Sequence, residues 1–136
     1  MDTARPDFTG VWNFNRERSS LQITPPDSTT FVIEHHEPQF HLERTHTAGT
    51  TSDFFAVDLV TDGRTTEFTH AGMKLKGRLS WESDALVFYS EISREGMSGT
   101  NIVRYRLTDS GRTLTALELM SFAGEAHENH WVLDRR

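Results

Sequence analysis

The sequence contains no cysteine among its 136 residues. A chain without cysteine can form no disulfide framework, no thiolate zinc site and no cysteine nucleophile. It also has no apolar run near the roughly 18 residues of a membrane helix, and its first residues, MDTARPDF, lack the apolar core of a secretory signal. These absences predict a cytoplasmic protein, or a mature chain that has already been processed, and no insertion into a membrane.

Basic charge is also scarce. The 14 Lys and Arg residues are scattered and outnumbered by 20 Asp and Glu residues, which gives a formal net charge of −6. A nucleic-acid partner is therefore not expected. The sequence has no P-loop, no G-x-G-x-x-G and no G-x-S-x-G, so nucleotide binding and serine-hydrolase chemistry lack their usual motifs. The length, with 10% aromatic and 25% charged residues, predicts one globular domain over residues 1–136.

What is present is an alternation of apolar and polar residues with a period of two. Residues 73–81, MKLKGRLSW, place Met73, Leu75, Leu79 and Trp81 on one face, the pattern of a strand buried on one side. Similar runs occupy residues 9–15, 29–36, 39–47, 53–60, 65–70, 85–94, 100–108, 113–122 and 126–135. Short turn signals separate them, among them Asp62-Gly63. The pattern predicts about ten strands joined as a meander.

Only residues 16–28 break the alternation, and Pro25-Pro26 limits any helix there to a turn or two. We expect a short helical or irregular cap after the first strand. A meander of about ten strands hides its edges and buries one face by closing on itself. The predicted fold is therefore all-β, a single up-and-down antiparallel barrel.

The opening strand carries the tripeptide Gly10-Val11-Trp12, the G-x-W signature of lipocalins and fatty-acid-binding proteins. The chain resembles a group of bacterial lipocalin-like domains of the calycin superfamily. Besides the tripeptide, the resemblance rests on the segments FTGVWNFNRERSS, TDGR, YRLTDSGRTLT and the final LDRR. The resemblance implies a structural contact between Trp12 and Arg135 at the barrel floor. The Arg and Tyr carboxylate site of fatty-acid-binding proteins is not carried over, because Arg104 and Arg106 point outward when Tyr105 points inward.

Pairing the strands through their turns assigns the inner face, because a slip of one residue would move every side chain to the other face. His35 meets Phe40, Tyr105 meets Ala116, and Phe55 meets His70 across Asp62-Gly63. The polar residues on that face are His35, Arg44, His46, His70, Ser90, Asn101, Tyr105, Glu118, His127 and Asn129. Ionisable groups are costly to bury, so this set predicts a cavity that holds water or a ligand.

A blander interpretation stands beside this one. Arg44, His46 and His127 also fit as rim residues in contact with water, and His35 and His70 fit as hydrogen-bonded core residues among aromatics. Glu118 sits in mid-strand, where its alternative role is an ion pair with Arg44; a register error, favoured by Leu117 and Leu119, would instead turn it outward.

The histidines do not form a recognisable metal motif. His35 and His36 lie on opposite faces of a strand, and His127 and His130 would share a face only on a helix. A metal site built from His35, His46, His70 and Glu118 is not supported by the spacing of these residues in the sequence. Haem binding through one of the histidines has no support in the sequence either. No metal and no cofactor is expected.

The first functional hypothesis is binding of a small hydrophobic, amphipathic or aromatic molecule in the barrel. Arg44 with Tyr105 is the inward pair that could hold an anionic head group. The candidate ligand-binding residues are Arg44, His46, Phe31, Phe40, Phe55, Phe68, Phe88, Asn101, Met120, His127, Asn129 and Trp131.

The second hypothesis is a cofactor-free isomerase, cyclase, hydratase or lyase that uses the same cavity. Its general acid or base would be Glu118 or an inward histidine, and its candidate catalytic residues are Glu118, His35, His70 and Tyr105. A third reading is an interaction role, in which Phe54 and Val60 on the outer face form a dimer contact. Both a monomer and a homodimer remain open.

Overall fold

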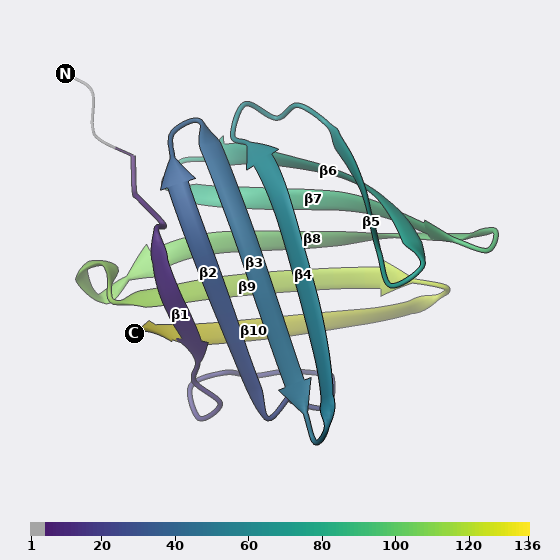
Figure 1. Cartoon of the computed structure of the whole chain (residues 1–136), viewed down its shortest axis with the longest axis horizontal. Helices are drawn as coiled ribbons and strands as arrows, with labels where there is room; N and C mark the ends of the chain where they lie inside the picture. The colour runs from purple at the N-terminus through teal and green to yellow at the C-terminus, as the bar shows by residue number, and fades with distance from the viewer. Residues whose placement is uncertain (1–4) are drawn as a thin grey trace.

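The protein forms one antiparallel sheet that curls into a nearly closed barrel (Figure 1). The computed structural model describes residues 5–136. The strands are β1 (Gly10–Phe14), β2 (Ser28–His36), β3 (Gln39–Ala48), β4 (Thr51–Val60), β5 (Thr66–His70), β6 (Met73–Glu82), β7 (Ala85–Arg94), β8 (Met97–Thr108), β9 (Thr113–Phe122) and β10 (Glu125–Arg135). Their order is β4-β3-β2-β1-β10-β9-β8-β7-β6-β5. The predicted all-β barrel of about ten strands is confirmed.

Alternation of burial along the strands separates the inner from the outer face. In β2, Phe31, Ile33 and His35 are buried, whereas Glu34 and His36 are exposed. Strands β2 to β4 cross in front of β7 to β10 in Figure 1, so the inner faces of the two halves pack against each other. Each Phe, Leu or Ile buried between them contributes about 1.5–3 kcal/mol relative to exposure. This burial fixes which side chains meet inside the barrel.

The G-x-W tripeptide closes one end of the barrel. Trp12 is fully buried, and the Arg135 guanidinium carbon lies 4.2 Å from the centre of its ring. Gly10 has a φ of +156°, and a Cβ there would lie 2.5 Å from Arg135 Nη1. Arg135 also donates to the carbonyls of Thr9 at 2.8 Å and Gly111 at 3.0 Å. Glycine at the first position of the tripeptide therefore leaves the room that the guanidinium occupies.

The expected hairpin across Asp62-Gly63 is wrong. Strands β4 and β5 are the two ends of the sheet order and share no ladder of hydrogen bonds. The link between them turns toward β6 instead, where Asp62 bridges to Ser80 and the Gly63 N–H donates to the Leu79 carbonyl at 2.9 Å. The backbone of the link therefore forms its hydrogen bonds with β6. The edges of β4 and β5 that face each other have no backbone hydrogen bonds between them.

Side chains close this seam between β4 and β5. The Phe55 ring lies 5.6 Å from that of Phe68 and 5.1 Å from that of His70, centre to centre. His70 Nε2 lies 3.2 Å from Asp53 Oδ1. Phe55 and His70 thus meet as the sequence indicated, but through side-chain packing rather than through strand pairing.

The cap over residues 15–27 is irregular and contains no helix. It is held by a β-bridge between Ser20 and His130, by Leu21 packing against the core, and by the buried Pro26. Within residues 5–136 the helical structure is a single 3₁₀ turn at Asp109–Gly111, and no helix there is long and apolar enough to cross a membrane.

Candidate functional site

Glu118 is the centre of a polar cluster on the inner face of β8, β9 and β10. It lies directly across from Asn129 in the register of β9 and β10. Asn129 Nδ2 and Trp131 Nε1 donate to Glu118 Oε1, and Asn101 Nδ2 donates to Oε2, each at 3.1 Å. Hydrogen bonds to a carboxylate are stronger than those between neutral groups. The Glu118 carboxylate is therefore held in one orientation by N–H donors from two neighbouring strands.

Two oxygen atoms in this cluster, Glu118 Oε2 and Asn101 Oδ1, have a free lone pair among the described residues. A carboxylate offers about four lone-pair positions, so the two donors on Oε1 and the one on Oε2 leave one position on Oε2. Asn101 Oδ1 is buried and has no hydrogen-bond partner within residues 5–136. Because Asn101 donates to Oε2 through its other amide atom, both free acceptors belong to this one hydrogen-bonded pair of side chains.

The ion pair of Glu118 with Arg44, an alternative raised by the sequence, does not form. Arg44 Nη2 binds Asp53 Oδ2 at 2.6 Å, and its Cζ lies 5.3 Å from the centre of the Phe55 ring. Arg44 Nε is buried without a partner among the described residues. Arg44, Asp53 and His70 thus form a separate charged group beside the seam between β4 and β5.

Tyr105 crosses the interior to the opposite wall. It is 4% exposed, and its ring centre lies 6.3 Å from that of Phe31 on β2. Burial raises the pKa of the Tyr105 phenol, and the negative charge of Glu118 raises it further, while Arg44 opposes the shift. Tyr105 is therefore protonated at neutral pH and lies within electrostatic range of both charged groups.

His46 is neutral at neutral pH and is packed on the cluster. Its ring is stacked on Trp131 with centres 5.4 Å apart, and its Nδ1 is hydrogen-bonded to Thr29 Oγ1 at 2.6 Å. Burial, with a smaller contribution from the positive charge of Arg44, lowers the pKa of His46 to about 4. A neutral His46 brings no positive charge to Glu118.

Asn129 also connects the cluster to the cap. Its Oδ1 accepts from the Gln22 N–H at 2.8 Å, and the Gln22 side-chain oxygen accepts from the Glu128 N–H at 2.7 Å. One backbone N–H of the cap therefore bonds to a side chain that also binds Glu118.

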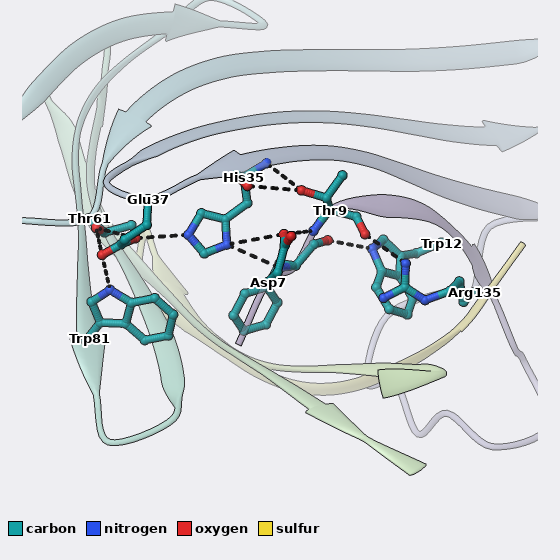
Figure 2. A network of polar contacts seen from close by, with 9 residues as sticks. Asp7, Thr9, Trp12, His35, Glu37, Thr61, Trp81 and Arg135 are labelled. Carbon is teal, nitrogen blue, oxygen red and sulfur yellow. Dashed lines mark hydrogen bonds and ion pairs between the residues drawn. The ribbon is translucent and has the colours of Figure 1, made fainter. Parts of the chain in front are cut away.

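His35 lies near Thr9 and Trp12 at the closed end of the barrel (Figure 2), where its side chain bonds to Phe8 and Glu37 rather than to Glu118. Its Nδ1 accepts from the Phe8 N–H at 3.2 Å, so Nε2 is the nitrogen that donates to Glu37 Oε1 at 3.0 Å. Glu37 also accepts from Thr61 Oγ1 and Trp81 Nε1, both at 2.9 Å. This is the hydrogen-bonded core histidine that the sequence offered as the blander interpretation.

The four candidate catalytic residues are therefore not brought together. Glu118 and Tyr105 share the interior, His70 lies at the seam, and His35 lies at the closed end. His127, whose side chain is 36% exposed, lies 3.9 Å from Glu125 near the β9–β10 turn, as a rim residue would. Phe31, Phe40 and Phe88 are buried in the core, and Phe55, Phe68 and Met120 are partly buried.

Two grooves are lined mostly by outward-facing residues, with Phe68, Leu75 and Ile92 of the inner face at the larger and Met120 and His127 at the smaller. The larger, about 830 Å³, follows the outer faces of β5 to β8 and includes Glu67, Lys74, Lys76, Tyr89 and Glu91. Neither groove contains Glu118 or Tyr105. The internal pocket bordered by these residues stays a prediction. Within residues 5–136 no group of three or more metal-ligating side chains comes together.

Several partners of the cluster were missed from the sequence. Thr29 shares the inner face of its strand with Phe31 and Ile33, and Asp53 shares that of Phe55, so strand parity could have found both. Gln22 lies in the irregular cap, where no periodicity indicates a direction.

No protein-family model and no curated protein matches the chain. Solved structures match it over nearly its whole length. Secretory abundant heat soluble protein 4 from Ramazzottius varieornatus has a TM-score of 0.65 at 12% identity and covers 99% of both chains. The zebrafish ileal bile acid-binding protein, solved with cholic acid, has a TM-score of 0.61 at 17% identity, covering 95% of this chain and 98% of its own.

Human cRBP IV has a TM-score of 0.61 at 15% identity and covers 96% of this chain and 99% of its own. At these identities the likeness concerns the fold alone. The chain has the ten-stranded, nearly closed barrel of the lipocalin and fatty-acid-binding proteins.

Proposed function

We propose that the protein binds a small amphipathic or aromatic molecule inside the barrel, with the polar part of the ligand at Glu118. The observation that carries this proposal is the pair of free acceptors at Glu118 Oε2 and Asn101 Oδ1, on a wall that is otherwise aromatic and apolar. Unpaired polar atoms are costly to bury, and a ligand donor would satisfy both.

The surrounding side chains supply the apolar part of such a site. Trp131 and Tyr105 flank Glu118, and Phe31 faces Tyr105 from the other wall. The candidate ligand-binding residues in this proposal remain Arg44, His46, Phe31, Phe40, Phe55, Phe68, Phe88, Asn101, Met120, His127, Asn129 and Trp131. The name of one structural neighbour, a zebrafish ileal bile acid-binding protein solved with cholic acid, supports a small-molecule site in such a barrel.

The proposal extends to the partner and the setting. The partner is a small molecule rather than nucleic acid, the protein acts in the cytoplasm as a monomer or homodimer, and it is a bacterial lipocalin-like domain of the calycin superfamily. The scattered basic residues support the absence of a nucleic-acid partner, and the G-x-W tripeptide supports the lipocalin-like assignment. Size-exclusion chromatography with light scattering tests the oligomeric state.

Binding is favoured over general-base catalysis by the hydrogen bonds of Glu118. A general base needs a lone pair directed at the proton that it takes. Both N–H donors on Oε1 are protein groups, so only Oε2 could act. The histidines that would complete an acid–base pair, His35 and His70, lie at the closed end and at the seam.

The indole N–H groups of the three tryptophans give a direct test. Trp131 donates to Glu118, whereas Trp12 and Trp81 donate to Phe8 and Glu37 at the closed end. In ¹H–¹⁵N NMR spectra, a panel of phenylalkyl and alkyl amines, alcohols and acids should include members that move the Trp131 indole signal and leave the other two in place. The same members should raise Tm. A panel that moves no Trp131 signal and leaves Tm unchanged would contradict the proposal.

A further inference from the structure

We propose that the site at Glu118 selects amphipathic amines, with the ammonium group bound between Glu118 Oε2 and Asn101 Oδ1. This inference rests on the proposed function and adds the chemical class of the ligand.

The cluster has a negative charge without a cationic partner. Among residues 5–136, Glu118 is bonded to two amides and an indole, all of them neutral. Arg44 is paired with Asp53 at 2.6 Å. A cation from outside the chain would therefore meet an uncompensated carboxylate, whereas a second carboxylate would meet a like charge.

The free atoms are both acceptors. An ammonium group has three donors and no acceptor, so it can bind Glu118 Oε2 and Asn101 Oδ1 together. A carboxylate brings only acceptors and would leave both atoms unpaired, with the full penalty of desolvation. An alcohol brings one donor and satisfies one of the two. The order of affinity expected from hydrogen bonding is amine, then alcohol, then carboxylate.

The walls around the acceptors are suited to the hydrocarbon part of the molecule. Trp131 is 6% exposed and Tyr105 is 4% exposed, and both contribute aromatic surface next to the carboxylate. An ammonium group near such rings gains a further cation–π attraction. A phenylalkyl chain can then extend along the Phe31 side of the interior, which faces Tyr105.

The test compares three probes that share a phenyl ring on a four-methylene chain and differ only in the head group: 4-phenylbutylamine, 4-phenylbutan-1-ol and 5-phenylpentanoate. Dissociation constants are measured by calorimetry at pH 7, and the Trp131 indole signal reports the site. We expect the amine to bind about tenfold or more tightly than the carboxylate, with the alcohol between them. The amine should move the Trp131 signal further than those of Trp12 and Trp81.

Glu118→Gln removes the charge with little change in volume. The new amide oxygen can still accept from Asn129 and Trp131, and Asn101 can turn its own amide to accept from the new NH₂ group, so the fold has a route to a satisfied cluster. The ratio between amine and carboxylate affinities should fall to about one in this variant. Glu128→Gln is the matched control, because Glu128 lies on the outer face of β10, where its side chain pairs with His130. That control should keep the ratio.

The possible outcomes separate the two proposals. If carboxylate or alcohol binds wild type as tightly as the amine, the amine selectivity is overturned while a binding site remains. If none of the three probes binds and the Trp131 signal does not move, the amine inference fails, and the wider panel described above then tests the proposed function. If Glu118→Gln fails to fold, the comparison of the three probes on wild type decides the question alone.

Discussion

Trp131 joins the two walls of the barrel through one side chain. Its indole N–H donates to Glu118 on β9, and its ring is stacked on His46 on β3, which is hydrogen-bonded to Thr29 on β2. The stack covers one face of the indole and partly shields the imidazole from water. The environment of His46 is therefore set by the same residue that positions the carboxylate.

The depressed pKa of His46 makes stability depend on pH. In the unfolded chain His46 titrates near 6.5, whereas in the fold its pKa is about 4. Between these values the unfolded state binds more protons, so the free energy of unfolding falls as pH is lowered from about 6.5 to 4 and is fully present above that range. After allowance for solvent near a partly exposed ring, we expect the His46 contribution to be about 1–2 kcal/mol.

Urea denaturation from pH 7 to pH 4 checks this expectation with His46→Gln. An amide at this position can still bond to Thr29 but does not titrate, so the variant should lose less stability than wild type over the range. His36→Gln, at an exposed position on the outer face of β2, is the control and should follow the wild-type curve. Parallel curves for wild type and His46→Gln would show that His46 titrates normally in the fold.

At the scale of elements, the seam between β4 and β5 depends on Phe55. With no backbone ladder across it, the Phe55 contacts to Phe68 and His70 are the aromatic packing that holds β5 in place. Phe55→Ala should lower the free energy of unfolding by about 2–3 kcal/mol, somewhat less than for a fully buried Phe. It should also speed hydrogen exchange in β5 more than in β8 or β9, which are paired on both sides.

Phe54→Ala is the matched control for this experiment. Phe54 is the neighbouring residue of β4, points outward and is 56% exposed. Its removal should change stability by less than about 0.5 kcal/mol in a monomer. Equal losses for the two variants would mean that side chains across the seam do not stabilise β5.

The strands were predictable from sequence because burial on one face leaves a period of two. The same parity placed Glu118, Asn101 and Asn129 on the inner face, where the structure brings them together. Parity carries no information about which strands are neighbours, so the Asp62-Gly63 turn was wrongly taken to form a hairpin. Nor could it give the partner of Arg44, because the choice between Glu118 and Asp53 depends on side-chain reach in three dimensions.

At the scale of the whole molecule, the two ends of the interior have different chemistry. The closed end contains the fully buried Phe8 and Trp12. It also contains the hydrogen-bonded pair of His35 and Glu37, which Figure 2 shows. The cluster around Glu118 lies further along the barrel, bonded to the cap through Asn129 and Gln22. The hydrogen-bonded network of the closed end is thus separate from the one that holds the Glu118 carboxylate.

This separation predicts that stability and binding can be changed independently. Phe8 packs against His35, Phe40 and Trp81, so Phe8→Ala should lower the free energy of unfolding by about 3 kcal/mol or more. Because Phe8 lies at the end away from Glu118, the affinity for 4-phenylbutylamine should stay within about twofold of wild type at a temperature where both are folded. Denaturation and calorimetry on the same samples measure the two quantities.

Ile23→Ala, at a partly exposed position in the cap, is the control for losing a hydrophobic side chain elsewhere and should lower the free energy of unfolding by less than about 1 kcal/mol. A tenfold loss of affinity in Phe8→Ala would show instead that packing at the closed end and the geometry of the Glu118 cluster are coupled through the strands that they share.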